Sequence, residues 1–318
     1  LTPYVGKTIN LSGFEPTLVK AGNIDGKQIA IPTSTNTLAL FYNPDLLKKT
    51  GVALPAEDYS WADYATFLAK VSAAGTKAAG GQQVYGGIDY ATTFWFFLQW
   101  LVQEGKTPFN ADGTFGFNEK DMTQFLNLTA DLRKAKQDYP IARTTQLLPK
   151  GGFTVNESTS EISWDNFLAG YVADSGTKNI GMMPVPSGSD GKKSMFFKPS
   201  MLLSAGANTK HPAAAATLIN FLLTDPEVGA IFGTSKGVPA DKAQRAALKL
   251  KPGSVDASVT AYEKAVADKV TKPVPLPVKG FGSIESDYKR LGEDLSYGRT
   301  TVDAFVKEWF ANAAQATQ

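Results

Sequence analysis

Residues 28–51 read QIAIPTSTNTLALFYNPDLLKKTG and place two apolar runs on either side of a polar segment. Residues 28–31 form a short run that Pro32 ends, and residues 37–42 form a second run with little alternation, which is typical of a strand covered on both faces. The polar loop between them, residues 33–36, carries hydroxyls and an amide but no general base and no thiol. This pattern predicts two strands that flank a polar loop.

The second strand leads directly into a helix whose two ends are both marked. Asn43 is a favourable cap, and Pro44 follows at the first helical position, where a missing N–H costs nothing. Lys48 and Lys49 suit the negative end of the helix dipole, and Gly51 suits a left-handed stop. The stretch therefore predicts strand, loop, strand and helix in close succession.

Four further segments recur in the same order as in a known family. They are GKTPFNADGTF (105–115), SWDNF (163–167), LSAGANTKHPAAAATLINFLLTDPE (203–227) and SYGRTTVDAF (296–305). Together with LxLFYNxDLLKKxG (38–51), they resemble the extracellular solute-binding proteins of ABC importers, in the carbohydrate-binding branch that includes maltose-binding protein. No single segment is specific, but their order and spacing are.

The resemblance implies an α/β, two-lobe periplasmic-binding-protein-like fold with three interlobe crossings. We expect residues 1–36 and 203–272 to form the N-terminal lobe, and residues 37–202 and 273–318 to form the C-terminal lobe. The start, LTPYVGKTINL, resembles the middle of a family member. We therefore expect the first βα units to lie upstream of Leu1, together with a lipoprotein signal that anchors the protein outside the cell or in the periplasm, and the N-terminal lobe to be incomplete.

Composition narrows the class of protein further. The 318 residues suffice for two lobes with separate cores. The 32 basic and 30 acidic residues are well mixed and give a net charge of +2, so nothing indicates nucleic acid binding. There is no cysteine, and His211 is the single histidine, so we expect no disulfide, no metal and no cofactor. The sequence contains neither a signal peptide nor an apolar run of about 18 residues, the length that spans a bilayer.

Periodicity and capping patterns predict the remaining elements. The expected helices are 61–74, capped by Ser60 with Asp63, about 92–104, 119–136, capped by Asn118, 166–171, 211–223, a helix after a Thr224 capping box, one from Phe281, and 302–314. The expected strands are 84–88, 180–186 and a buried strand at 201–204. Trp309 lies on the apolar side of the last helix, which indicates a packing role.

The helix at about 92–104 is too aromatic for one buried stripe. Phe94, Phe97 and Leu101 share a face, which leaves Trp95 about 100° round the helix axis. An indole near a helix N-terminus can stack on the C–H face of a pyranose ring. From its sequence neighbours alone, Trp95 is as strongly expected in the core as at a ligand. Because the resemblance implies an aromatic that stacks on sugar here, we prefer Trp95 to Trp100 as the ligand residue.

Trp164 is the second expected stacking platform. The resemblance implies a strand that ends in a tryptophan facing the cleft, although residues 159–163 are more polar than the small apolar strand usual in the family, which allows the alignment to slip by a residue or two. Asp165 and Asn166 are nearby polar groups. For Asp165, a ligand contact and a cap of the following helix are equally weighted.

The other expected ligand residues follow from the resemblance. Phe197 and Lys198 lie on the second crossing, where the lysine could donate to a sugar hydroxyl or a carboxylate, or simply be solvated. Residues 272–277, KPVPLP, indicate the third crossing, and Phe281 follows it. The full expected set, with no catalytic residue, is Thr35, Asn36, Asp89, Thr93, Trp95, Trp164, Asp165, Phe197, Lys198 and Phe281.

These residues predict a binding protein and not an enzyme. A neutral sugar or oligosaccharide that contacts both lobes would favour a closed state, which membrane permease subunits would recognise, and we expect the protein itself to be monomeric. One alternative is a glycoside hydrolase, but no pair of carboxylates with an evident reason for a raised pKa appears in the sequence. A second alternative is a binder of a charged small solute.

Overall fold

The computed structural model describes residues 1–317 and divides them into two units. Unit 1 comprises Leu1–Leu38, Trp164–Ala169 and Phe196–Val274, and unit 2 comprises Ala39–Ser163, Gly170–Met195 and the residues from Pro275 onward. This division places Trp164–Ala169 and residues 196–202 in unit 1, whereas the boundaries expected from the sequence placed them in the second lobe.

Unit 1 combines short strands with five helices and three 3-10 segments among the described residues. The strands are β1 (Asn23–Ile24), β2 (Lys27–Gln28), β3 (Ala30–Pro32), β4 (Ser34–Asn36), β8 (Lys198–Pro199), β9 (Leu202–Ser204) and β10 (Val238–Pro239). The α-helices are α1 (Pro16–Val19), α9 (Pro212–Thr224), α10 (Pro226–Phe232), α11 (Lys242–Ala246) and α12 (Val255–Ala265). The 3-10 segments are η1 (Thr2–Tyr4), η2 (Lys20–Gly22) and η4 (Asp165–Phe167).

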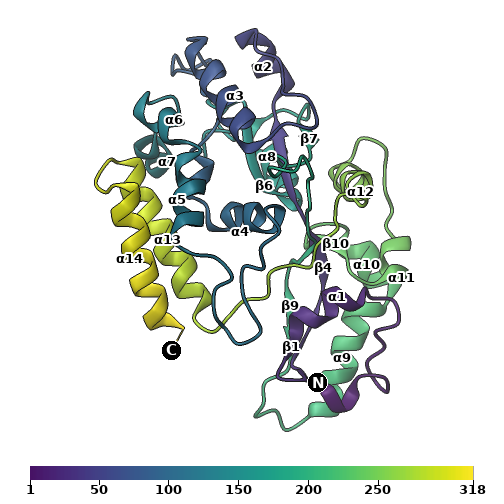
Figure 1. Cartoon of the computed structure of the whole chain (residues 1–318). Coiled ribbons are helices and arrows are strands. Elements are labelled where there is room, and N and C mark those ends of the chain that lie inside the picture. Colours follow the sequence, from purple (N-terminus) through teal and green to yellow (C-terminus); the bar gives the residue numbers. More distant parts are fainter. Residues whose placement is uncertain (318) are drawn as a thin grey trace. The chain divides into compact units, whose positions relative to one another are not determined.

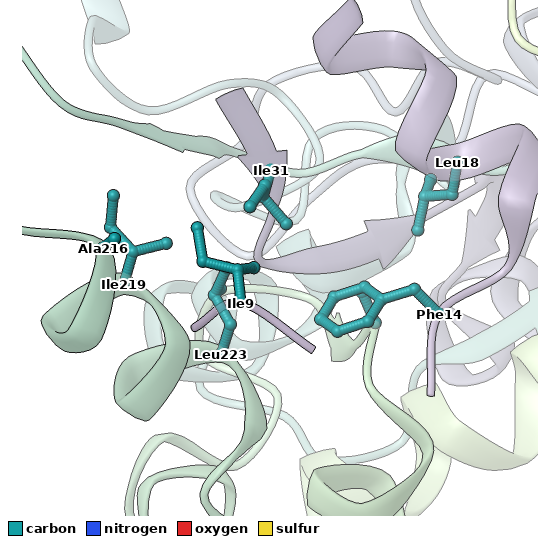
Figure 2. Close-up of a cluster of buried hydrophobic side chains, with 8 residues drawn as sticks. Ile9, Phe14, Leu18, Ile31, Ala216, Ile219 and Leu223 are labelled. Atoms are coloured by element: carbon teal, nitrogen blue, oxygen red, sulfur yellow. The ribbon is translucent and has the colours of Figure 1, made fainter. Parts of the chain in front are cut away.

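The core of unit 1 lies where α9 packs against β3. Figure 2 shows Ile219 and Leu223 of α9 directed toward Ile9, with Ile31 of β3 nearby and Phe14 beside them. Ala216, Ile219 and Leu223 recur at helical spacing, so one face of α9 is apolar. The apolar periodicity that predicted this helix is thus explained by the core it fills.

The predicted polar loop after Pro32 is in fact a strand. β4 pairs antiparallel with β10 on one side and with β8 on the other, in the registers Thr35↔Val238 and Asn36↔Lys198. The polar side chains of Ser34 to Asn36 gave no strand pattern, but the two neighbouring segments satisfy the backbone groups. The partners come from distant parts of the chain, which local sequence does not reveal.

The strand expected to be buried at 201–204 is largely exposed. β9 pairs antiparallel with β3, and Leu203 packs against the core. Leu202 points to the other face and is 42% exposed. In the described residues this sheet has two strands, so alternation leaves one face of β9 uncovered.

Unit 2 contains a three-stranded sheet and most of the helices. The strands, in the order β6-β5-β7, are β6 (Ser160–Trp164), β5 (Leu38–Tyr42) and β7 (Gly181–Met183). The helices are α2 (Pro44–Thr50), α3 (Trp61–Ala73), α4 (Phe94–Gln103), α5 (Glu119–Asn127), α6 (Ala130–Lys134), α7 (Ile141–Leu147), α8 (Leu168–Ser175), which begins in unit 1, α13 (Phe281–Ser296) and α14 (Val302–Ala316), with the 3-10 segment η3 (Tyr90–Thr92).

Several predicted elements of unit 2 are confirmed. β5 is buried from Leu38 to Phe41, as expected for a central strand. The capping box of Ser60 and Asp63 begins α3. α13 and α14 lie side by side (Figure 1), and Trp309 is completely buried with its Nε1 donating to the carbonyl of Ile284 at 3.0 Å. The packing role predicted for Trp309 is correct.

Three local predictions are wrong, and a fourth differs only in detail. The helix expected over 119–136 is broken into α5 and α6, where Arg133 Nη2 donates to the carbonyl of Leu126. Residues 84–88 form no strand and make one isolated bridge, from Tyr85 to Ser158. The helix expected at 166–171 is present, with its first residues in η4 and the rest in α8. The cap of α10 is Asp225, not Thr224, because its carboxylate accepts the Glu227 amide.

The cap at the start of α2 offers a direct test of local stability. Asn43 Oδ1 accepts the Leu46 amide at 3.0 Å, and its Nδ2 donates to Asn156 Oδ1 at 3.0 Å. We expect Asn43→Ala to lower the free energy of unfolding by about 1–2 kcal/mol, because both bonds are lost. Urea denaturation measures the change. Lys49→Ala, on the exposed side of the same helix, should change the stability by less than about 0.5 kcal/mol.

Residues 1–317 contain no single helix that could span a membrane, because none has the length and apolar character required. α9 and α10 meet the requirement only as a pair, and they are bent by 63° at the break between them.

Candidate functional site

Three of the expected ligand residues meet on the β4–β8 side of unit 1. Asn36 is the cross-strand neighbour of Lys198, and the Lys198 Nζ lies 4.8 Å from the centre of the Trp164 ring. The Trp164 and Lys198 side chains are half-buried, and Phe197 beside them is half-buried as well. Asn36, Lys198 and Trp164 therefore form one local cluster, which we call the β4 cluster.

The side-chain carbonyl of Asn36 accepts no hydrogen bond from the described residues. Its Oδ1 is buried and has no hydrogen-bond partner in the described residues. Gly237 lies against it, and any Cβ at residue 237 would collide with this oxygen. A buried carbonyl without a partner costs about 1–3 kcal/mol. The site is therefore chemically suited to a ligand that donates a hydrogen bond.

Two buried carboxyl groups, from η4 and α12, contact β4 and the residue that follows it. Asp165 is completely buried, and its Oδ2 accepts the Thr37 amide at 3.1 Å. Glu263 of α12 is 6% exposed, and the Thr35 hydroxyl lies 2.9 and 3.1 Å from its two oxygens and donates to it. The two carboxyls thus contact the residues on each side of Asn36.

Burial determines the ionisation of this pair. It raises the pKa of Asp165 to about 7 and raises the pKa of Glu263 well above its usual value, with the negative charge of Asp165 as the second cause for Glu263. Since burial and a neighbouring negative charge both disfavour ionisation, the pair retains a proton to higher pH than isolated carboxyls do.

Asp165 does not cap the following helix, so that alternative is wrong. Its Oδ2 bonds the Thr37 amide of unit 1, and Trp164 occupies the cap position of η4 without a side-chain bond. Glu263 was missed from the sequence. The available signal was its place on the apolar face of α12, between Val259 and Val266 at i−4 and i+3. A charged residue on a buried face marks a paired or proton-sharing group.

Thr35, an expected ligand residue, is engaged inside the unit. It is 5% exposed and bonds both Glu263 and the carbonyl of Val238. Its observed contacts therefore position β4.

A second group of expected residues meets in unit 2. Trp95 at the start of α4 and Phe281 at the start of α13 have ring centres 5.5 Å apart, tilted by 52°. Both side chains are half-buried, whereas Trp100 is 5% exposed. Thr93 is the cap residue of α4, but its side chain makes no capping bond there. Trp95 and Phe281 form an aromatic pair that retains accessible surface.

Asp89 has a full set of internal partners in unit 2. Its Oδ2 accepts Arg133 Nη1 at 2.7 Å, and its Oδ1 accepts the Ala91 amide at 3.1 Å. The Asp89 side chain is 3% exposed and that of Arg133 is 11% exposed. A buried ion pair of this kind fixes the approach to α4. Asp89 remains a predicted ligand residue, but its observed bonds are structural.

The described residues contain no cluster of side chains of the kind that holds a metal ion. No set of three or more histidine and carboxylate side chains within residues 1–317 is arranged to hold an ion. The available chemistry consists of aromatic faces, an amide carbonyl, a lysine and a buried carboxyl pair. Groups of these kinds are suited to stacking and to hydrogen bonding.

A model of the family described as bacterial extracellular solute-binding protein matches residues 1–228. The chain belongs to this family. The expected α/β periplasmic-binding-protein-like fold is also confirmed by solved structures. An extracellular solute-binding protein of Alicyclobacillus acidocaldarius has a TM-score of 0.74 at 24% identity, covering 100% of this chain and 79% of that one.

Two other similar solved structures are of proteins that are named together with a saccharide ligand. An oligogalacturonide-binding protein of Yersinia enterocolitica has a TM-score of 0.75 at 20% identity, over 99% of this chain and 80% of that one. A receptor of Streptomyces glaucescens, solved unliganded and with acarbose, has a TM-score of 0.72 at 19% identity, over 98% of this chain and 76% of that one. At these sequence identities, the structural similarity shows only that the three proteins share a fold.

Curated relatives of this solute-binding protein are longer than the chain. A "Probable ABC transporter-binding protein" of Deinococcus radiodurans is 25% identical over 212 residues, which cover 65% of this chain and 50% of the relative. A binding protein of Brucella abortus is 22% identical over 311 residues, which cover 94% of this chain and 70% of the relative. The matched region thus spans half of the first relative and about two thirds of the second.

Proposed function

We propose that this solute-binding protein delivers a neutral oligosaccharide to the permease of an ABC importer. The observation that supports this most directly is the β4 cluster, in which Asn36 is the cross-strand neighbour of Lys198, the Lys198 ammonium lies over the Trp164 ring, and the side-chain carbonyl of Asn36 has no hydrogen-bond partner in the described residues. An indole and a hydrogen-bond acceptor are complementary to the C–H face and the hydroxyls of a sugar ring. The Trp95–Phe281 pair would supply a second stacking surface.

Two partly accessible aromatic positions favour an oligosaccharide over a single sugar. Transport would follow from closure of two lobes around a ligand that binds the closed state better, a change that the permease would recognise. In this proposal the protein acts as a monomer outside the cell or in the periplasm, anchored by an N-terminal lipid.

One observation favours a second candidate, an acidic oligosaccharide. The Lys198 ammonium lies over the Trp164 ring, where it could bond a carboxylate on a stacked sugar. Isothermal titration with neutral malto-, xylo- and galacto-oligosaccharides and with oligogalacturonides distinguishes the candidates. Lys198→Met should abolish a preference for the acidic ligand and leave a neutral one bound within a few-fold.

The glycoside hydrolase alternative is disfavoured by the carboxyl pair. Asp165 and Glu263 are buried and bond the Thr37 amide and the Thr35 hydroxyl, whereas hydrolysis needs two carboxyls that face a substrate between them, about 5–9 Å apart. An assay for released reducing sugar tests this point. Turnover of a bound oligosaccharide would contradict the transport proposal.

Removal of the Trp164 indole tests the stacking role. We expect Trp164→Ala to weaken oligosaccharide binding roughly tenfold to a hundredfold, because a ring face is lost, which corresponds to about 1.4–2.8 kcal/mol. Isothermal titration measures the dissociation constant. Tyr297→Ala removes an aromatic that is 38% exposed in unit 2 and serves as the control. Equal affinity of Trp164→Ala and the parent protein would refute the role of this residue.

A further inference from the structure

A groove with a volume of about 980 Å³ runs along α3 in unit 2. One wall is residues 51–56, which follow α2 and are all apolar or glycine. The other wall is a single face of α3 and its cap, on which residues recur three and four apart: Asp63, Thr66, Phe67, Lys70, Ala73 and Ala74. None of the residues that line the groove belongs to the β4 cluster or to the Trp95–Phe281 pair.

Backbone groups of the first wall have no partner within the chain. Among residues 1–317, no group accepts the amides of Ala53, Leu54 and Ala56, and no group donates to the carbonyls of residues 52–55. Pro55 has a fixed φ and restricts the preceding Leu54 to extended backbone. Unpaired peptide groups on an extended segment are the feature by which a sheet edge accepts an additional strand.

Both ends of this wall are held in place. The Val52 amide donates to the Thr50 hydroxyl at 3.2 Å, next to the end of α2. Beyond the turn that follows the wall, the carbonyl of Tyr59 accepts the Ser187 amide at 2.8 Å, and the Tyr59 hydroxyl donates to the carbonyl of Pro184 at 2.8 Å. A wall fixed at both ends is preorganised, so the binding of a strand loses little conformational entropy.

The charges in the groove select the side chains of such a strand. Lys70 is exposed and contacts no carboxylate in the part of the chain that the structure describes. Asp63 lies two helical turns before it, and Asp58, which also lines the groove, contacts no cation in residues 1–317. Phe67, which is 4% exposed, provides an apolar floor between these charges.

The spacing of the charges matches an extended peptide. Asp63 and Lys70 are separated by two turns of α3, which corresponds to about 10 Å along a helix axis. An extended chain rises about 3.3 Å per residue and turns residues i, i+2 and i+4 to one face, so the outer two lie about 13 Å apart. Long basic and acidic side chains cover the difference. The groove therefore fits a strand whose inward side chains are basic, apolar and acidic in turn.

We propose that the groove between α3 and residues 52–56 docks an extended segment of a partner protein, which pairs with the free backbone groups as an added strand. Its basic side chain lies at Asp58 and Asp63, its apolar side chain at Phe67 and its acidic side chain at Lys70. The groove continues past Lys70 to Ala73 and Ala74, so the docked strand need not end within it. The inference is independent of the proposed function, because it involves other residues and requires no bound sugar.

A blocked peptide without free termini tests the groove. The probe is acetyl-Lys-Thr-Val-Thr-Glu-amide, titrated into the whole chain while the backbone amide signals are followed by NMR. We expect a Kd of about 1 mM or tighter, with the largest shifts at the amides of Ala53 and Leu54. Thr66→Tyr fills the middle of the exposed α3 face and should weaken binding about tenfold or more.

A double comparison tests the contact with Lys70. Replacing the glutamate of the probe by glutamine should weaken binding to the parent protein about twofold to fivefold, as expected for an exposed ion pair. In Lys70→Gln the same replacement should have no effect. Lys120→Gln, which removes an exposed lysine of α5 in the same unit, is the matched control and should behave like the parent protein.

The outcomes separate this docking groove from the sugar site. Equal affinity of the probe for the parent protein and for Thr66→Tyr would overturn the proposal, and so would the absence of shifts at Ala53 and Leu54 up to about 5 mM peptide. Tighter binding of the same peptide with free termini would assign the groove to a free oligopeptide and also contradict a protein partner. Failure of the oligosaccharide titrations would refute the transport proposal and leave these results unchanged.

Discussion

Asp89→Ala is expected to lower the free energy of unfolding by about 3–5 kcal/mol. The substitution leaves the Arg133 guanidinium 11% exposed without its carboxylate partner, bonded only to the Thr129 hydroxyl and the Leu126 carbonyl. It also removes the acceptor for the Ala91 amide at the approach to α4. Urea denaturation followed by tryptophan fluorescence measures the loss, since α4 carries two of the tryptophans of unit 2.

A surface ion pair in the same unit provides the control for Asp89. Glu308 contacts Arg290, and both side chains are 49% exposed. Glu308→Ala should cost less than about 1 kcal/mol, because water screens an exposed pair. Stability of Asp89→Ala equal to that of Glu308→Ala, together with weaker sugar binding, would instead support a ligand role for Asp89.

Gly237→Ala should damage both the stability of unit 1 and the binding site. Gly237 has a φ of +97°, which side chains rarely tolerate, and its Cβ would lie 2.5 Å from the carbonyl oxygen of Thr35 and closer still to Asn36 Oδ1. Backbone strain and overpacking together predict a loss of about 2–5 kcal/mol. The displaced Asn36 should also weaken any ligand that bonds its carbonyl.

Gly253→Ala separates the effect of backbone strain from that of steric overlap. Gly253 lies in unit 1 with a φ of +75°, and nothing lies within 4 Å of its Cβ position. It should therefore cost only the conformational strain, about 1 kcal/mol. Denaturation and titration of both alanine variants measure the difference. Equal losses in the two variants would show that the contact between Gly237 and β4 carries no energy.

The sequence predicted the elements that depend on local signals. Caps at Asn43, Ser60 and Asn118 are each satisfied by the expected side-chain bonds, and the apolar periodicity of α9 and α14 placed those helices within two residues. The family and its fold were also predicted, because the order of several moderate motifs is informative where each alone is not.

The features that failed depend on contacts between distant residues. β4 has a polar sequence, and it is a strand because residues about 160 and 200 positions later pair with it. The carboxyl pair consists of Asp165 and Glu263. In a single sequence, the only sign that Glu263 is buried is its charge on an apolar helix face. Among the expected ligand residues, the structure groups Asn36 with Lys198 and Trp164, and Trp95 with Phe281, while Asp89 and Thr35 are occupied by internal bonds.

The double-sided pairing of β4 has a consequence for selectivity. A central strand has its peptide groups occupied before any solute arrives, so binding need not freeze a mobile loop and loses little conformational entropy. A preorganised segment of this kind adapts poorly to ligands of different shape. Discrimination among solutes would then depend on the few side chains that β4 and its neighbours present, and exchanging those side chains would be the direct route to a receptor with altered preference.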